Sequence, residues 1–137
     1  MKVFITARFK GIENKKQIEG LCWIIRESWF EDFCFIRDVE DYQKIFNNPY
    51  DLWVKVKSEI EKCDAILIDF DGPASGRMIE LWVAFAMKKK IILIVKKDLF
   101  VKDTIIWVTN NIIQYNELED IKKPMKKLLE LRKVPWK

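Results

Sequence analysis

An apolar run over residues 65–87 breaks at small residues and then resumes with helical periodicity. Its first part, Ala65–Ile68, is too short and too rich in β-branched residues for a helix, so it predicts a strand buried on both faces. Asp69 to Asp71 end this strand, and the turn-forming residues 72–76 follow. Residues 77–87 then predict a helix that is apolar all round, which is typical of a buried helix or of one at a subunit interface.

Strand and helix patterns alternate along the rest of the chain. We expect strands at Lys2–Thr6, Asp32–Arg37, Ala65–Ile68, Ile91–Val95 and Ile112–Tyr115, and helices at about Asn14–Trp29, Pro49–Cys63, Arg77–Met87 and Leu118–Leu131. Residues 104–108 fit either a short helix or an extended connection, and Pro124 should interrupt the last helix. The alternation predicts an α/β fold, a three-layer α/β/α sandwich whose parallel sheet of about five strands has the order 2-1-3-4-5. Residues 1–137 are expected to form a single domain.

In this strand order the direction of the connections reverses between the first and the third strand. Open α/β sheets bind ligands in the crevice at the carboxyl ends of the strands at such a point. The loops after Thr6 and after Phe70 should therefore face each other across one crevice, with Glu80 just inside it. The polar loop after the second strand, which runs through residues 47–49, is long enough to close over that crevice as a lid.

Composition excludes several classes of function. The 25 basic and 21 acidic residues give a net charge of +4, and the scattered lysines predict a solvated surface with no nucleic-acid partner. No apolar stretch reaches membrane-spanning length, so we expect no membrane partner and a soluble, cytoplasmic protein. The absence of histidine excludes Ser-His-Asp and Cys-His triads and histidine-bearing metal sites. Cys22, Cys34 and Cys63 lack CxxC spacing and suit reduced core thiols, so no metal and no cofactor are expected.

Glu80 is the only ionisable residue between Arg77 and Lys88, and on a helix it shares a face with Ala84 and Met87. Burying an unpaired carboxylate is costly or forces its protonation, so this residue needs an explanation. In one interpretation Glu80 lies in the first turn, offsets the helix dipole and pairs with Arg77. In the other it is a catalytic carboxylate whose site opens at the strand end.

Basic residues follow the first predicted strand. Arg8 and Lys10 could form a phosphate cradle at the strand end. They could equally be solvated loop charges, because the loop has neither Walker nor GxGxxG spacing. Ser75 and the backbone amides of residues 72–76 could complete a 5′-phosphate site at a helix N-terminus.

Residues 76–89 read G-x-x-x-E-L-x-x-A-x-A-x-x-K and follow a strand, an aspartate and a small-residue loop. This pattern resembles the nucleoside 2-deoxyribosyltransferase superfamily, which includes nucleoside 5′-monophosphate N-glycosidases. The segment KVFITARFKG is similar to the family's first strand and loop, EIEKCDAILIDFDGPASG to its third strand, and WVTNNIIQYNEL to its last strand. The resemblance therefore covers most of the chain.

The resemblance implies a flavodoxin-like fold, a nucleoside or nucleotide as the small-molecule partner, and a homodimer or higher homo-oligomer with composite active sites. It implies that Glu80 is the nucleophile that takes the deoxyribosyl group from a departing base, as in retaining glycosidases. Asn111 falls where the family donates a polar residue from a neighbouring subunit, although it also suits a turn before the edge strand. The expected substrate-binding residues are Thr6, Ala7, Arg8, Lys10, Gly72, Ser75, Gly76 and Asn111.

Three positions depart from the family's pattern. Phe4 stands where a tyrosine is usual and Val56 where an aspartate usually lies near the leaving base, so both departures remove polar help for catalysis. Trp82 stands where a glycine commonly follows Glu-Leu and should reshape the packing beside the nucleophile. Asp69 or Asp71 is a candidate for the missing acid, although Asp69 is also a common strand-end residue.

Three functions remain open at this point. The leading hypothesis is an enzyme that cleaves or exchanges the N-glycosidic bond of a 2′-deoxynucleoside or its 5′-monophosphate. The alternative is a nucleotide-binding or sensing module on the same fold without efficient catalysis, which the departures at Phe4 and Val56 favour. A flavodoxin-like response domain is a third hypothesis, weakened because no acidic cluster follows the first strand.

Overall fold

The computed structural model describes residues 1–72 and 74–131, and the structural statements below concern these residues. Trp136, which we expect either to dock on the domain or to extend from it, lies outside them. The strands are β1 (Lys2–Thr6), β2 (Glu31–Cys34), β3 (Ala65–Phe70), β4 (Lys90–Lys96) and β5 (Asn111–Tyr115). The helices are α1 (Ile12–Glu27), α2 (Phe35–Asp38), α3 (Pro49–Glu61), α4 (Ser75–Ala86), α5 (Asp103–Val108), the 3-10 turn η1 (Leu118–Ile121) and α6 (Lys122–Leu131).

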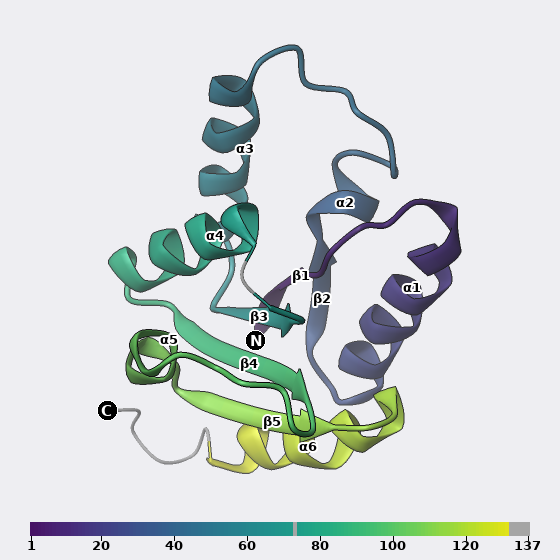
Figure 1. Ribbon diagram of the computed structural model, residues 1–137, viewed down its shortest axis with the longest axis vertical. Helices are drawn as coiled ribbons and strands as arrows, with labels where there is room; N and C mark the ends of the chain where they lie inside the picture. The colour runs from purple at the N-terminus through teal and green to yellow at the C-terminus, as the bar shows by residue number, and fades with distance from the viewer. Residues whose placement is uncertain (73, 132–137) are drawn as a thin grey trace.

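The five strands form one parallel sheet with the order β2-β1-β3-β4-β5. Helices α1 and α6 pack on one face of this sheet, and α3, α4 and α5 pack on the other (Figure 1). The predicted flavodoxin-like α/β/α architecture and the predicted strand order are therefore confirmed.

Alternate residues of the central strands enter two separate cores. In β3, Ala65 and Leu67 face α1 and α6, whereas Ile66 and Ile68 face α3 and α4. All four side chains are at most 1% exposed. A strand that is buried on both faces reads as a continuous apolar run, which is why the sequence identifies this strand so directly.

The second strand is shorter than predicted. It ends at Cys34, and the chain then forms the single helical turn α2 where a strand to Arg37 is expected. Asp38 accepts a hydrogen bond from the backbone N–H of Cys34 at 2.9 Å, and Arg37 donates to both Asp32 and Asp38. These side-chain hydrogen bonds close the turn and stop the strand.

Pro124 does not interrupt the last helix, contrary to the prediction. The turn η1 precedes α6, and Pro124 is the third residue of α6. The first N–H groups of a helix have no partner within the helix, so a proline there loses no hydrogen bond. The ambiguous segment 104–108 belongs to a helix, α5.

The carboxyl ends of β1 and β3 lie side by side at the point where the connections reverse direction. Strand β3 continues through Asp69 to Phe70, so Asp69 lies within the strand and does not end it. Helix α4 begins at Ser75, two residues earlier than predicted. Across residues 1–72 and 74–131, no helix is long and apolar enough to cross a membrane.

Candidate active site

Glu80 lies in the second turn of α4, where its side chain is half-buried and reaches the end of β1. Its Oε1 accepts a hydrogen bond from the Thr6 hydroxyl at 3.2 Å. Burial raises the pKa of Glu80 to about 8, because desolvation outweighs the Thr6 hydrogen bond and the charge of Arg77, which act in the opposite direction. A carboxyl group with its pKa shifted to near neutrality is typical of a functional site.

The helix-dipole interpretation of Glu80 is wrong on both of its points. Helix α4 begins at Ser75, which makes Glu80 its sixth residue and places it beyond the first turn. Arg77 forms its ion pair with Asp71 and not with Glu80. The structure therefore leaves the carboxylate without a structural role in capping the helix.

A cavity of about 310 Å³ opens beside Glu80, and we call it the Glu80 cavity. The end of β1, the segment after β2, α3 and the first turns of α4 form its walls. Four of the expected substrate-binding residues line it, namely Thr6, Ala7, Arg8 and Gly76. The volume is at the lower end of the range of small-molecule sites, which is about 300–1,000 Å³.

Two guanidinium groups on the wall of this cavity, those of Arg8 and Arg77, hold the carboxylate of Asp71, which does not itself line the cavity. Asp71 pairs with Arg8, Nε to Oδ2 at 3.4 Å, and with Arg77 through a hydrogen bond to Oδ1. Arg77 is only 5% exposed, and its Nε has no hydrogen-bond partner among the residues described. Two positive charges therefore face one negative charge, and a buried donor remains free beside the Glu80 cavity.

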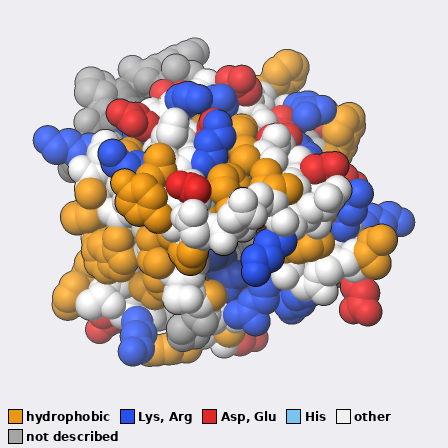
Figure 2. Space-filling view, turned by 90° about the horizontal axis from the view of Figure 1, so that it is seen from above, with side chains coloured by type: hydrophobic (Ala, Val, Ile, Leu, Met, Phe, Trp, Pro, Cys, Tyr) orange, Lys and Arg blue, Asp and Glu red, His pale blue; other side chains and the backbone are white. Residues whose placement is uncertain are grey.

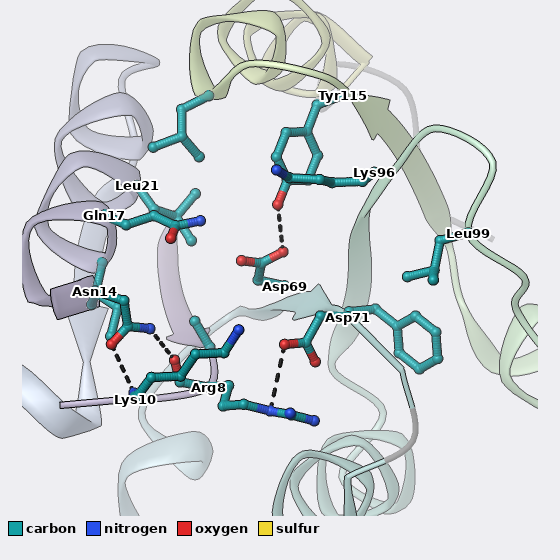
Figure 3. A pocket seen from close by; sticks show the side chains of 14 residues that line it. Arg8, Lys10, Asn14, Gln17, Leu21, Asp69, Asp71, Lys96, Leu99 and Tyr115 are labelled. Atoms are coloured by element: carbon teal, nitrogen blue, oxygen red, sulfur yellow. Dashed lines mark hydrogen bonds and ion pairs between the residues drawn. The ribbon is translucent and has the colours of Figure 1, made fainter.

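Asp69 and Lys10 line a different cavity, of about 330 Å³, on the α1 side of the sheet (Figure 3). We call it the Asp69 cavity. The two cavities share only Ala7 and Arg8 among their lining residues. The structure thus separates the expected acid from the expected nucleophile.

Tyr115 fixes the Asp69 side chain in its cavity. The tyrosine hydroxyl donates a hydrogen bond to Asp69 Oδ1 at 2.7 Å. Burial raises the pKa of Asp69 above its ordinary value, and the Tyr115 hydrogen bond opposes that rise.

Three other expected substrate-binding residues line neither cavity. Gly72 has a φ of 122°, a left-handed conformation that favours glycine in the loop before α4. Ser75 is the exposed first residue of α4. Asn111 pairs with Ile92 near the beginning of β4, so it lies toward the amino ends of the strands, whereas Glu80 lies at their carboxyl ends. Its Oδ1 is buried without a hydrogen-bond partner in the described part of the chain.

Glu40 and Arg77 are the cavity residues that sequence reasoning missed as binding or catalytic candidates. Glu40 belongs to the polar segment after α2, lines the Glu80 cavity, and has its pKa raised by burial. Its charge also contributes to the raised pKa of Glu80, so the two carboxyl groups influence each other. Nothing in the local sequence distinguishes Glu40 from a solvated loop charge, because its burial results from tertiary packing.

The three departures from the family's pattern occupy different environments. Phe4 is fully buried, and its ring contacts those of Phe33 and Phe35. Val56 is 4% exposed and lines the Glu80 cavity as an apolar wall. Trp82 is 46% exposed, so it lies outside the core instead of filling space beside Glu80.

Within residues 1–72 and 74–131, no group of three or more His, Cys, Asp and Glu side chains is placed to hold a metal ion. The ionisable and hydroxyl groups that line the Glu80 cavity are the carboxyl groups of Glu40 and Glu80, the hydroxyl of Thr6 and the guanidinium groups of Arg8 and Arg77.

No protein-family model matches the sequence, and no curated protein matches it. Solved structures do match. The CMP N-glycosidase BcmB of Clostridium botulinum is 25% identical, with a TM-score of 0.67 over 93% of this chain and 99% of that chain. A 2-deoxyribosyltransferase of Bacillus psychrosaccharolyticus is 14% identical, with a TM-score of 0.71 over 89% of this chain and 90% of that one. A conserved protein from Enterococcus faecalis V583 is 10% identical, with a TM-score of 0.76 over 93% and 98%.

The last two similarities concern the fold, and the first extends over nearly the full length of both chains. The strand order and the βα unit that carries Glu80 agree with these similarities on the fold. This chain has a nucleoside 2-deoxyribosyltransferase-like fold.

Proposed function

We propose that this protein cleaves or transfers the N-glycosidic bond of a 2′-deoxynucleoside 5′-monophosphate or its nucleoside, with Glu80 as the nucleophile. One observation carries the proposal. An otherwise unexplained carboxylate, hydrogen-bonded to Thr6, faces a small-molecule cavity at the strand ends of this fold. The similarity to a CMP N-glycosidase over 93% of the chain supports the reaction class.

The reaction proceeds by two displacements at the anomeric carbon. A Glu80 oxygen attacks C1′ while the bond from C1′ to the base nitrogen breaks, and the base leaves with the bonding electrons and takes up a proton. Water or a second base then attacks C1′ and releases Glu80 as a carboxylate. Thr6 orients the attacking carboxylate through its hydrogen bond.

The departing base needs a proton, and Glu40 is the group that we assign to supply it. It is the other carboxyl group on the wall of the Glu80 cavity, whereas Asp69 lines the cavity on the far side of the sheet. Burial raises the pKa of Glu40, which favours the protonated form that a general acid requires. A proton from Glu40 would also replace the one that Val56, an apolar residue, cannot give to the base.

The charges around the Glu80 cavity favour a 5′-monophosphate over a free nucleoside. Arg8 and Arg77 together outweigh Asp71, and the Nε of Arg77 remains available as a buried donor. The N-terminus of α4 adds backbone N–H groups and the positive end of its dipole. A phosphate here would accept charge-assisted hydrogen bonds from the guanidinium groups.

Substitution of Glu80 tests the nucleophile directly. Glu80→Gln keeps the size of the side chain but removes the attacking charge, so turnover should fall by several orders of magnitude. A 2-fluoro-deoxynucleoside substrate slows breakdown of the glycosyl-enzyme, and intact-mass analysis should find an adduct on Glu80 in the parent and none in the variant. Glu27→Gln, at the exposed end of α1, is the matched control and should retain turnover. An active Glu80→Gln protein, or an adduct on Asp69, would refute the mechanism.

Binding without efficient catalysis is the second candidate function. Phe4 is fully buried and Val56 forms an apolar wall, so neither supplies the polar help expected of the family at these positions. A panel of deoxynucleosides and deoxynucleotides, incubated with and without a second base and analysed by chromatography, separates the two. Free base indicates a hydrolase, a new nucleoside indicates a transferase, and saturable binding without either product indicates the binding module.

A further inference from the structure

We propose that the Asp69 cavity is a second binding site, separate from the Glu80 cavity, and that it takes a small sugar phosphate. It does not depend on the proposed function, because Asp69, Lys10, Lys96 and Tyr115 line this cavity and not the Glu80 cavity, and the two cavities share only Ala7 and Arg8. The cavity of about 330 Å³ lies between α1 and the carboxyl ends of β3, β4 and β5. Its size suits one small metabolite.

The centre of this cavity offers a fixed hydrogen-bond acceptor. Asp69 Oδ1 accepts from Tyr115, and that bond holds the carboxyl group in one orientation. Its second oxygen, Oδ2, has no protein hydrogen-bond partner among the described residues. Sugar hydroxyl groups are the donors that such a carboxylate commonly binds, and Gln17 adds an amide at the same wall.

The same cavity carries positive charge that its own carboxylates do not balance. Figure 3 shows the side chains of Lys10 and Lys96 reaching toward Asp69 from different sides. Neither lysine forms an ion pair in the described part of the chain, whereas Arg8 is already paired with Asp71. Lys10 and Lys96 therefore add two positive charges to a cavity in which Arg8 already pairs with Asp71 and burial raises the pKa of Asp69, so the site attracts an anion.

The loop that presents Lys10 is held in place before any ligand arrives. Asn14 accepts a hydrogen bond from the backbone N–H of Lys10 at 2.7 Å and donates one to the carbonyl of Arg8. A preorganised loop binds with less loss of conformational entropy than a mobile one. This arrangement distinguishes the cavity from a surface on which lysines merely lie near one another.

The two halves of the site define the chemical class of the ligand. A neutral sugar or nucleoside would leave both lysines without an anion, and inorganic phosphate would leave the carboxyl group without hydroxyl donors. A phosphorylated pentose satisfies both halves within one small molecule, with its phosphate at the lysines and its hydroxyl groups at Asp69.

Calorimetric titration of the full chain with ribose 5-phosphate tests this site, with ribose and inorganic phosphate as the comparison ligands. Ribose 5-phosphate should bind saturably and more tightly than either fragment. Lys96→Ala should weaken that binding by about tenfold or more, because a charge-assisted hydrogen bond is lost. Lys97→Ala removes the neighbouring exposed lysine, which lines no part of the cavity, and should leave the affinity unchanged. Asp69→Asn should also weaken binding of the sugar phosphate, but should hardly affect inorganic phosphate.

Two further measurements locate the ligand. The Gln17 side-chain amide should shift in a ¹H–¹⁵N spectrum on titration, and Glu80→Gln should retain the parent affinity for ribose 5-phosphate. Equal affinity for inorganic phosphate would mean an adventitious ion only and would overturn the proposal. An affinity that depends on Glu80 but not on Lys96 would place the ligand in the Glu80 cavity, and would equally overturn it. Because turnover of the Lys96→Ala variant on nucleotides should match the parent, failure of this site and failure of the proposed function can be told apart.

Discussion

As the proposed nucleophile, Glu80 must carry a charge to attack a sugar, yet its surroundings favour the neutral form. Desolvation is the largest influence and raises its pKa to about 8, while the Thr6 hydrogen bond and the charge of Arg77 favour ionisation. An enclosed carboxylate also reacts better as a nucleophile once it is ionised, because no water shell has to be removed. The activity of the free protein should therefore depend on a proton that leaves near pH 8.

We predict that kcat/KM for a deoxynucleoside monophosphate has a bell-shaped pH profile, which rises as Glu80 ionises and falls as Glu40, the assigned general acid, loses its proton. On the rising limb the value for the free protein follows the ionised fraction of Glu80, whose pKa is raised to about 8. On that limb the rate should fall by about tenfold for each unit by which the pH decreases. Initial rates between pH 5.5 and 9.5 on a substrate of constant charge would measure this. A profile that is flat from pH 6 to pH 9 would contradict the role of Glu80 as an attacking carboxylate.

The same raised pKa predicts how Glu80 affects stability. At pH values between the ordinary pKa of a glutamate and about 8, the folded state holds a proton on Glu80 that the unfolded state has lost. The parent should therefore lose stability as pH rises from the ordinary pKa of a glutamate to about 8, with little further loss above that, and Glu80→Gln should not incur that loss. Denaturant unfolding at pH 5, 7 and 9 should show a free-energy advantage of the variant that increases with pH. Glu27→Gln, which changes an exposed carboxylate, should show no such trend.

The loop between β1 and α1 is the element that serves both cavities. Arg8 lines the Glu80 cavity and the Asp69 cavity and binds Asp71 between them. Its position follows from the strand order, because β1 ends beside β3 where the connections reverse. A single loop can therefore contribute positive charge on both sides of one sheet.

We predict that Arg8→Ala weakens binding of a deoxynucleoside monophosphate by about tenfold but hardly changes binding of the free nucleoside. The phosphate loses a charge-assisted hydrogen bond, whereas the nucleoside makes none to this residue. Lys16→Ala, an exposed lysine of α1, is the matched control for net charge. Titration of each variant with both ligands gives the comparison. Equal binding of nucleoside and monophosphate by the parent, unchanged in Arg8→Ala, would exclude the phosphate site.

Elements with a strong local pattern could be predicted from the sequence, and those that depend on tertiary contacts could not. The strand at 65–70 is apolar because both of its faces are covered, and that requirement is visible in the sequence. The end of β2 depends instead on the Asp38 carboxylate, which accepts the hydrogen bond that the backbone N–H of Cys34 would otherwise donate to a neighbouring strand. The burial of Glu40 has the same origin, since it arises from packing against distant elements and leaves no periodic signal.

The candidate site likewise has features that could be predicted from the sequence and features that could not. The position of Glu80 beside the end of β1 follows from the strand order and the βα unit, both of which could be predicted. The separation of Asp69 from Glu80 could not, because successive residues of a strand alternate between the two faces of the sheet and β3 extends two residues beyond the predicted end. The two additional residues of β3 thus place Asp69 in the Asp69 cavity, on the α1 side of the sheet, whereas Glu80 on the following helix lines the Glu80 cavity.

At the scale of the whole molecule, α3 and α4 leave an apolar surface uncovered. Its largest exposed side chains are Tyr50, Val54, Ile79, Trp82 and Phe85, each between 43% and 77% exposed. Figure 2 shows hydrophobic side chains gathered on the left of the face, the side on which α3 and α4 lie in Figure 1. Side chains of both helices also line a groove of about 530 Å³ between them. Contiguous apolar surface of this kind marks an interaction site more often than a solvated face.

We predict that this surface joins two copies of the chain, so that light scattering at micromolar concentration gives at least twice the 16.5 kDa of one chain. The helix that carries Glu80 would then lie at the interface. In its own chain Asn111 lies at the opposite end of the strands from Glu80, so it could reach a Glu80 cavity only from the second copy. Trp82→Ser should shift the mass toward the monomer, since Trp82 and Phe85 pack edge to face at a centroid distance of 5.8 Å and would lose their partner surface together. Trp23→Ser removes an exposed tryptophan from α1, on the opposite face of the molecule, and should leave the mass unchanged. A parent that is monomeric under these conditions, or variants that behave alike, would contradict an interface at α3 and α4.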